Sequence, residues 1–169
     1  INLNGLCHGD IKLENIVVMN INDPTSYKLI DFGCMDEISN IIELIDKDNG
    51  FTDERTEFYH VWAPEFLIMT ELSVRRYNEY IDKLYIYMKE KVSTCDIKQI
   101  IKFATGSDII ELYKCDRALM ASKFDVWSVG ILIAITNLRP NMELVKNCLQ
   151  VLPNLRPTMS EVRALYEIE

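Results

Sequence analysis

The chain has 169 residues, of which 49% are apolar, and its formal net charge at pH 7 is −8. This length suits one domain or part of one with a hydrophobic core, and the negative charge argues against a nucleic-acid-binding protein, which needs a basic face. The five cysteines are odd in number and contain no CxxC pair, which indicates reduced thiols and therefore an intracellular, cytoplasmic protein.

The first predicted element is a β-hairpin near the N-terminus. Two runs rich in β-branched and aromatic residues, Ile16–Met19 and Tyr27–Ile30, are separated by turn-forming residues. The segment His-Gly-Asp-Ile-Lys-Leu-Glu-Asn precedes the first run at positions 8–15, and Asp31-Phe32-Gly33 follows the second. Antiparallel pairing brings these two flanking segments together at one end of the hairpin.

Three polar side chains of the flanking segments are candidate ligands. Asp10 and Asn15 come from the first segment and Asp31 from the second, so the hairpin would gather them at one point. Carboxylate and amide oxygens suit Mg²⁺, which prefers a few such ligands together with phosphate oxygens. The alternative interpretation of Asp10 is an ordinary residue of a tight surface turn.

The stretch 34–65 is acidic and ends in Ala63-Pro64-Glu65. Asn49-Gly50 predicts a turn, and we interpret Cys34 as a small packed residue rather than a reactive thiol. Isoleucines at helical spacing predict one short amphipathic helix in this stretch: Ile38, Ile41, Ile42 and Ile45.

The following segment, 66–124, has a helical pattern. One apolar stripe consists of Tyr77, Tyr80, Ile81, Leu84, Met88 and Val92. A second stripe, predicting another helix, consists of Ile97, Ile100, Ile101 and Ala104. Gly106-Ser107 predicts a break, and a third helical stretch covers Asp108–Met120. The stripes fit helix packing on the body of the protein or a docking surface for a partner, and packing is the commoner reason for them.

The C-terminal part is predicted to form three helices. Asp125–Asn137 is apolar on nearly every side, which is typical of a buried helix. No apolar run approaches membrane-spanning length, since Val129–Ile135 is too short, so no membrane partner is expected. Pro140 is expected to open the next helix and Pro153 to end it. That helix would bury Val145, Cys148, Leu149 and Leu152. Thr158–Glu161 is a capping-box pattern before a final helix, whose buried side would carry Val162, Leu165 and Tyr166.

Five of these motifs, in this order, resemble those of the protein kinase family. The segment 8–15 is similar to the catalytic loop, and Asp31-Phe32-Gly33 to the metal-binding motif of the family. Ala63-Pro64-Glu65 resembles the end of the activation segment. Asp125-Val126-Trp127-Ser128-Val129-Gly130 resembles the start of the central helix, and Leu155-Arg156-Pro157-Thr158 the segment before the last helix.

The resemblance implies a mainly α (α+β) fold, namely the large C-terminal lobe of a protein kinase with a small β-hairpin. It divides the chain into a catalytic loop and metal-binding hairpin (1–33), an activation segment (34–65), a helical insertion (66–124) and the central and C-terminal helices (125–169). The Gly-rich loop and strand lysine of the small lobe have no counterpart in the sequence. We therefore expect the N-lobe to be absent and this chain alone to be an inactive fragment.

The resemblance also implies a reaction, cofactors and residue roles. ATP and Mg²⁺ would be the cofactors, and serine or threonine hydroxyls of protein substrates would receive the phosphoryl group. Asp10 would orient the hydroxyl and accept its proton, Lys12 would steady the phosphate, and Asn15 and Asp31 would hold Mg²⁺. Structural roles would fall to His8, Phe32, Gly33, Glu65, Asp125 and Arg156.

Two structural contacts follow from the resemblance. Glu65 is expected to form a buried ion pair with Arg156, since an arginine can hold a carboxylate bidentately. Asp125 is expected to accept hydrogen bonds from the backbone of His8 and Gly9, which would brace the loop that presents Asp10.

Two rival functions remain. Gly9 stands where protein kinases usually have arginine, and His-Gly-Asp also occurs in aminoglycoside and choline kinases, so a small-molecule kinase of the same fold is one rival. Lys12 and the three later motifs argue against it. The other rival is a pseudokinase-like binding module without catalysis, which would apply if the chain is complete as given.

Overall fold

The computed structural model describes residues 5–23, 26–46, 62–67, 73–91, 100–136 and 141–166. Over these residues the protein is mainly helical with two small antiparallel sheets, as the sequence predicts at this level of detail. The elements in order are β1 (Leu6–Cys7), a 3₁₀ turn (Leu13–Asn15), β2 (Ile16–Val18), β3 (Tyr27–Leu29), β4 (Asp36–Glu37), α1 (Ile38–Asp46), α2 (Pro64–Leu67), α3 (Val74–Lys91), α4 (Gly106–Lys114), α5 (Arg117–Ser122), α6 (Phe124–Thr136), α7 (Met142–Cys148), a second 3₁₀ turn (Pro153–Leu155) and α8 (Met159–Tyr166).

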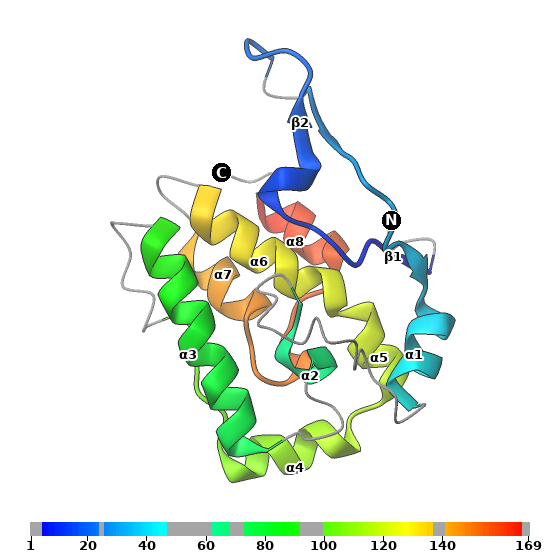
Figure 1. Ribbon diagram of the computed structural model, residues 1–169, viewed down its shortest axis with the longest axis vertical. Helices are drawn as coiled ribbons and strands as arrows, with labels where there is room; N and C mark the ends of the chain where they lie inside the picture. The colour runs from blue at the N-terminus through cyan, green and yellow to red at the C-terminus, as the bar shows by residue number, and fades with distance from the viewer. Residues whose placement is uncertain are drawn as a thin grey trace.

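Helix α6 forms the centre of the protein. It crosses the middle of the helical body in Figure 1 and packs most extensively against α7, with further contacts to α3, α5 and α8. Its side chains are buried around nearly the whole circumference, and Trp127 at its N-terminal half is among the largest fully buried residues. The prediction of a central buried helix is therefore confirmed over the described residues.

The apolar helical segment that contains α5 and α6 is longer than the sequence-based expectation for any apolar run. Among the described residues, Arg117–Thr136 is long and apolar enough to cross a membrane by length and composition, so the expectation that no run reaches this length is wrong. A share of 67% of its most apolar window is nevertheless buried inside the protein, as in the core helix of a globular domain.

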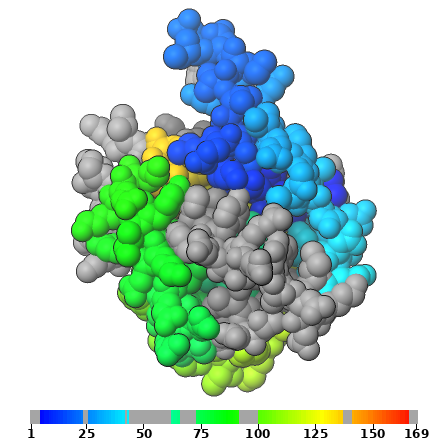
Figure 2. All heavy atoms as spheres, in the orientation of Figure 1, coloured from blue at the N-terminus to red at the C-terminus, as the bar shows by residue number. Residues whose placement is uncertain are grey.

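The predicted hairpin is present and one residue shorter at the end of each strand. β2 pairs with β3 in the register Ile16 to Leu29 and Val18 to Tyr27, and a second antiparallel pair joins β1 to β4. The β2–β3 hairpin projects from the helical body in Figure 1, and Figure 2 shows it standing clear of the body on the visible face. Accordingly, Val18 and Tyr27 are exposed although both are large and apolar.

The predicted helices of segments 34–65 and 66–124 are confirmed in two places. The isoleucine pattern forms α1, in which Ile41 is buried, and α1 packs against α5. The first stripe of the insertion forms α3 and faces the core with Tyr77, Tyr80, Ile81, Leu84 and Met88, whereas Val92 lies outside the described residues. The turn predicted at Asn49-Gly50 also lies outside them.

The second predicted helix of the insertion is wrong over the part that the structure describes. Residues 100–104 are not helical, although Ile100, Ile101 and Ala104 are buried. The side-chain amide of Asn78 on α3 takes up the backbone of Ala104: Nδ2 donates to the carbonyl (3.2 Å) and Oδ1 accepts from the N–H (2.8 Å). The backbone N–H and C=O of Ala104 thus have hydrogen-bond partners without a helix. The apolar spacing of this segment therefore reflects burial of its side chains and not helical structure.

Gly106 begins a helix rather than breaking one. Thr105 caps the N-terminus of α4 in a reciprocal capping box with Asp108, and the predicted stretch 108–120 divides into two helices at Cys115. Asp116 then caps α5 by accepting from the N–H of Leu119. Strong side-chain caps outweigh the weak helix propensity of glycine at such a position.

The C-terminal helices differ from the predictions in their boundaries. Asn141 caps α7, which ends at Cys148 well before Pro153, and Pro140 lies outside the described residues. The capping box of α8 is confirmed, because Thr158 and Glu161 exchange hydrogen bonds between side chain and backbone. Val162 is buried as predicted, but Leu165 is exposed at the far side of this last helix, and the side chain of Tyr166 is outside the description.

The contact between α6 and α7 leads to a stability prediction. A Cβ at Gly130 would lie 2.5 Å from Cβ of Cys148 and 3.1 Å from Cδ2 of Leu149, whereas a Cβ at Gly106 would meet nothing within 4 Å. We expect Gly130→Ala to lower the free energy of unfolding by about 1–3 kcal/mol, despite the better helix propensity of alanine. Urea unfolding tests this, with Gly106→Ala as the matched control that should change stability by less than about 0.5 kcal/mol. Equal midpoints for the two variants would contradict it.

Candidate active site

Asp125 anchors the loop that contains the candidate catalytic residues. It lies in the first turn of α6 and is almost fully buried. Its Oδ2 accepts from the backbone N–H of His8 at 2.8 Å and its Oδ1 from that of Gly9 at 3.1 Å, as predicted. A carboxylate at a helix N-terminus is favoured by the helix dipole, and two N–H donors compensate part of its lost hydration. The loop is therefore fixed to α6, the buried central helix.

The structure gives a local reason for glycine at position 9, which the sequence did not reveal. Its φ is +75°, and a Cβ there would lie 2.7 Å from the carbonyl oxygen of Cys34. Any side chain at this position would be strained by the backbone angle and blocked by the neighbouring chain. This explains a glycine where the resembled family has arginine. The interpretation of Cys34 as a packed residue is wrong, since Cys34 is exposed although its backbone packs against Gly9.

The structure brings Asp10, Lys12 and Asn15 together. The Nδ2 atom of Asn15 donates to Oδ2 of Asp10 and to its backbone carbonyl, both at 2.9 Å. The ammonium of Lys12 lies 2.9 Å from the same Oδ2 atom. Asp10 and Asn15 are buried, so the carboxylate is held in one orientation by an amide and a cation.

Asp31 lies beside this cluster through the hairpin. The N–H of Ile30 donates to the carbonyl of Asn15 at 2.8 Å, which places Asp31 one residue beyond the closing hydrogen bond. Asp31 is exposed, has a φ of 59°, and accepts from the N–H of Gly33 through Oδ1 at 3.3 Å. The hairpin therefore brings the two ends together as predicted, while a common open cleft for Asp10, Asn15 and Asp31 stays a prediction.

The donor set suits a magnesium ion held jointly with phosphate. Among the described residues no group of three His, Cys, Asp or Glu side chains is placed to hold a metal by itself. Asn15 uses its amide nitrogen on Asp10, which leaves the amide oxygen as its ligand atom, and Asp31 offers an exposed carboxylate. Mg²⁺ is commonly bound by one or two such protein oxygens, with phosphate and water completing the shell.

His8 is a packing and hydrogen-bonding residue, as interpreted from the sequence. It is fully buried, its ring lies 5.1 Å from that of Phe32, and its Nδ1 accepts from the N–H of Asp10 at 3.3 Å. An accepting Nδ1 carries no proton, so the proton of the neutral ring is on Nε2, which has no hydrogen-bond partner among the described residues. His8 thus links the segment that contains Asp10 to the one that contains Asp31.

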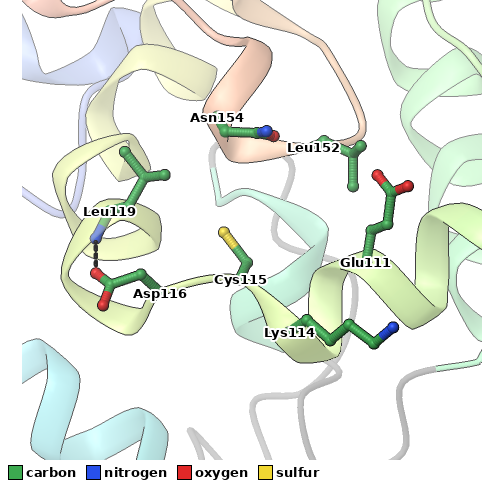
Figure 3. Close-up of a pocket in the computed structure, with 7 residues that line it drawn as sticks. All are labelled: Glu111, Lys114, Cys115, Asp116, Leu119, Leu152 and Asn154. Carbon is green, nitrogen blue, oxygen red and sulfur yellow. Dashed lines mark hydrogen bonds between the residues drawn. The ribbon is translucent and has the colours of Figure 1, made fainter.

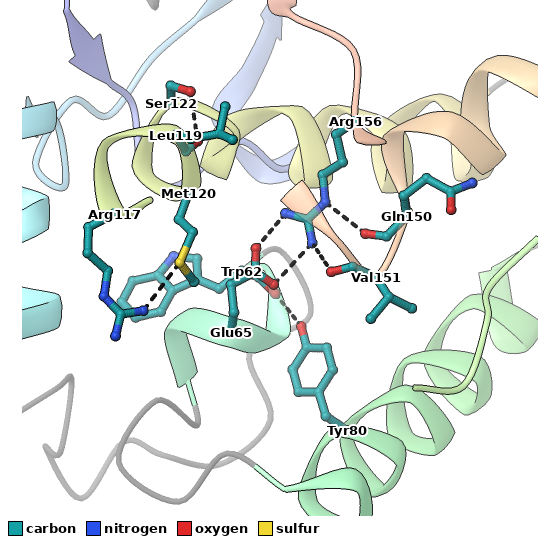
Figure 4. A network of polar contacts seen from close by, with 10 residues as sticks. All are labelled: Trp62, Glu65, Tyr80, Arg117, Leu119, Met120, Ser122, Gln150, Val151 and Arg156. Carbon is teal, nitrogen blue, oxygen red and sulfur yellow. Dashed lines mark hydrogen bonds and ion pairs between the residues drawn. The ribbon is translucent and has the colours of Figure 1, made fainter. Parts of the chain in front are cut away.

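Glu65 and Arg156 form the predicted ion pair, and both side chains are fully buried (Figure 4). Nη2 donates to Oε2 at 3.0 Å, Nη1 donates to Oε1, and Nε donates to the carbonyl of Gln150 at 2.9 Å. The guanidinium also lies 4.9 Å from the ring centre of Trp127. Burial opposes the charge of Arg156, but the Glu65 carboxylate outweighs it and raises the pKa of the guanidinium.

Sequence reasoning missed three residues of this region. Trp62 donates through Nε1 to the carbonyl of Gly9 at 2.6 Å, and the hydroxyl of Tyr80 donates to the carbonyl of Trp62. Lys123 donates to the carbonyl of Arg156 at 2.9 Å, and burial lowers the pKa of its ammonium. A tryptophan directly before Ala-Pro-Glu was a visible signal, but nothing local indicates the partners of Tyr80 or Lys123.

A hollow of about 300 Å³ lies away from this cluster, between the α4–α5 junction and the second 3₁₀ turn (Figure 3). It is lined by Glu111, Lys114, Cys115, Asp116, Leu119, Leu152 and Asn154. None of the candidate catalytic or metal-binding residues contributes to it, so it is separate from the candidate active site.

Comparison with known proteins gives a short local similarity to a kinase. Over 30 residues the chain is 57% identical to the probable serine/threonine-protein kinase 2 of Plasmodium falciparum (isolate K1 / Thailand). The match covers 18% of this chain and 6% of that protein, so the chain spans a small part of its relative. No protein-family model and no solved structure matches the chain. Over this stretch, the chain is therefore similar to a serine/threonine kinase.

The conformation of Gly9 can be tested against a second glycine. Gly5 has nearly the same φ, +73°, but a Cβ there would meet nothing within 4 Å. Gly5→Ala should therefore lower the free energy of unfolding by about 1–2 kcal/mol, the cost of the backbone angle alone. Gly9→Ala should lower the free energy of unfolding by about 1–3 kcal/mol more than Gly5→Ala does, because its methyl group also clashes with Cys34. Chemical unfolding of both variants gives the difference, and identical losses would show that the close approach has no energetic effect.

The buried ion pair leads to a second stability prediction. Glu65→Gln leaves the charge of Arg156 buried and unpaired, so we expect a loss of about 3–5 kcal/mol in the free energy of unfolding. Glu79→Gln is the control, because Glu79 pairs with Arg75 (3.2 Å) on the exposed face of α3. That change should cost no more than about 0.5 kcal/mol. A loss at Glu65 as small as the one at Glu79 would argue against an important buried pair.

Proposed function

We propose that this chain is the large helical lobe of a serine/threonine-type protein kinase, which transfers the γ-phosphoryl group of ATP to hydroxyls of protein substrates. The observation that supports it most is the buried bidentate pair of Glu65 and Arg156. The resemblance implied this pair between the end of the activation segment and the Arg-Pro-Thr segment. A small-molecule kinase gives no reason to expect the pair, since those enzymes lack both segments. The short similarity to a serine/threonine kinase points the same way.

The proposed chemistry assigns one task to each residue of the cluster. Bound ATP and Mg²⁺ would supply the phosphoryl group and neutralise its charge. Asp10 accepts the proton of the substrate hydroxyl, and Asn15 keeps the Asp10 carboxylate oriented through two hydrogen bonds. Lys12 places a positive charge 2.9 Å from that carboxylate, where a phosphate oxygen could share it. Asn15 and Asp31 contribute the protein oxygens for Mg²⁺.

The rival functions have less support. His-Gly-Asp is shared with aminoglycoside and choline kinases, but the close approach of Cys34 gives Gly9 a local reason that is independent of the substrate. The apolar stripe of α3 is buried within the protein, which supports the packing interpretation of the insertion over a docking surface. A cytoplasmic location remains part of the proposal, and it is consistent with Cys7, Cys115 and Cys148 being free thiols.

Replacing the proposed base tests the function. In the longest natural form of the protein that contains this chain, we expect Asp10→Asn to lower turnover with ATP and a protein substrate by about 10²–10⁴-fold. The control is Asp82→Asn, which makes the same change at an exposed position of α3 and should leave turnover unchanged. Radiolabelled phosphate incorporation into serine and threonine gives both values. Equal turnover in the two variants would remove Asp10 from the role of base, and incorporation into a small molecule alone would favour the rival kinase class.

A further inference from the structure

We propose that helix α3 of the insertion positions the candidate catalytic loop through a relay of two hydrogen bonds, from Tyr80 to Trp62 and from Trp62 to Gly9. The insertion is then a working part of the active site, and Tyr80 and Trp62 are positioning residues. The effect on phosphoryl transfer rests on the proposed function above, whereas the relay itself can be tested without any activity.

The first half of the relay joins Trp62 to the loop. Its indole Nε1 donates to the carbonyl oxygen of Gly9 at 2.6 Å, and its ring packs edge-on against Phe124 with centroids 5.6 Å apart. Phe124 begins α6, the central helix, so the indole is held by the core on one side and holds the loop on the other. A tryptophan N–H that is directed in this way gives a specific hydrogen bond as well as buried apolar area.

The second half of the relay joins α3 to Trp62. The hydroxyl of Tyr80, which is buried, donates to the backbone carbonyl of Trp62 (Figure 4). Burial raises the pKa of the Tyr80 phenol well above its ordinary value, so the hydroxyl keeps its proton at physiological pH and remains a donor. Tyr80 lies on the buried stripe of α3, whose other side chains pack into the core.

The position of Gly9 explains why this relay would affect catalysis. The carbonyl of Gly9 and the N–H of Asp10 belong to one planar peptide unit. Trp62 binds the carbonyl, and Nδ1 of His8 accepts from the N–H at 3.3 Å. Both polar groups of the unit are thereby fixed, and its plane sets the direction in which Asp10 leaves the backbone. A displacement of about 1 Å in a catalytic group can cost about 10²-fold in rate.

Helix α3 also provides a matched control for Tyr80. Tyr77 lies three residues earlier on the same buried stripe and is fully buried, but its hydroxyl has no hydrogen-bond partner within the part of the chain that the structure describes. Tyr80→Phe and Tyr77→Phe remove the same atom from neighbouring buried positions of one helix. The first change removes the proposed relay, and the second removes an unpaired hydroxyl.

The structural test uses the two tryptophans of the chain as reporters. Each gives one indole N–H signal in a ¹H–¹⁵N spectrum, and Trp62→Phe assigns the signal of Trp62. We expect Tyr80→Phe to shift the Trp62 signal and to speed exchange of its N–H with solvent by about two- to tenfold, the effect of one lost hydrogen bond. Tyr77→Phe should leave that signal unchanged. Unchanged Trp62 signals in Tyr80→Phe, in a variant whose circular dichroism shows it folded, would overturn the relay.

The kinetic test uses the longest natural form that transfers phosphate. We expect Tyr80→Phe to lower kcat by at least about threefold with little change in the KM for ATP, because orientation of Asp10 matters to the chemical step and little to nucleotide binding. Tyr77→Phe should leave both constants unchanged. A shifted Trp62 signal together with an unchanged kcat would overturn the positioning role. If no form of the protein transfers phosphate, the proposed function fails, while the indole spectra still decide whether α3 holds the loop.

Discussion

The candidate site depends on the hydrogen bonds that the buried carboxylate of Asp125 accepts from the backbone of the loop. A charge taken out of water at the start of the central helix requires donors, and the backbone N–H groups of His8 and Gly9 provide them. These hydrogen bonds therefore hold the loop against α6, the buried central helix. Burial and the nearby Asp125 charge also raise the pKa of the Cys7 thiol, so a second negative charge does not arise beside the carboxylate.

The same physical requirement appears at Arg156, whose guanidinium lies 4.9 Å from the ring centre of Trp127 on the central helix. A guanidinium has only N–H donors, and here Nε, Nη1 and Nη2 donate to the Glu65 carboxylate and to the carbonyls of Gln150 and Val151. Such an arrangement compensates part of the desolvation of the two charges, whereas removal of one partner would leave the other buried and unpaired. It fixes α2 against the segment before α8, although 91 residues separate the two partners in sequence.

The two buried charges are connected through Trp62 and α2. Trp62 lies three residues before Glu65, and its indole reaches the same Gly9 whose N–H binds Asp125. The end of the activation-segment-like stretch therefore touches the loop at one residue and the ion pair at another. The buried hydroxyl of Tyr80 on α3 also binds this connection, at the carbonyl of Trp62. Helix α3, in a segment for which the resemblance offers no counterpart, is in this way part of the framework around the loop.

Sequence patterns predicted the features that short-range chemistry determines. The hairpin, the amphipathic α1 and α3, the fully apolar α6 and the capping box at Thr158 all follow from local spacing. Most of the geometry around Asp10 was also implied, because the motif resemblance names the residues that meet.

The errors have a common cause, namely contacts between distant parts of the chain. Ala104 is buried at a helix-like spacing, yet its backbone is bound by Asn78 from another element. Leu165 continues an apolar pattern beyond the point where the core ends. The contacts of Trp62 and Tyr80 leave no periodic signal, since each depends on where a carbonyl of another segment lies. Such partners become visible only when the elements are placed in space.

The conformation of Gly9 also limits how this protein can change over evolutionary time. An arginine at this position would require both a new backbone angle and a different path for the chain at Cys34. A single Gly9→Arg substitution cannot provide both changes, so the glycine at this position is difficult to replace. An arginine at position 9 could be accommodated only after the neighbouring backbone at Cys34 had shifted.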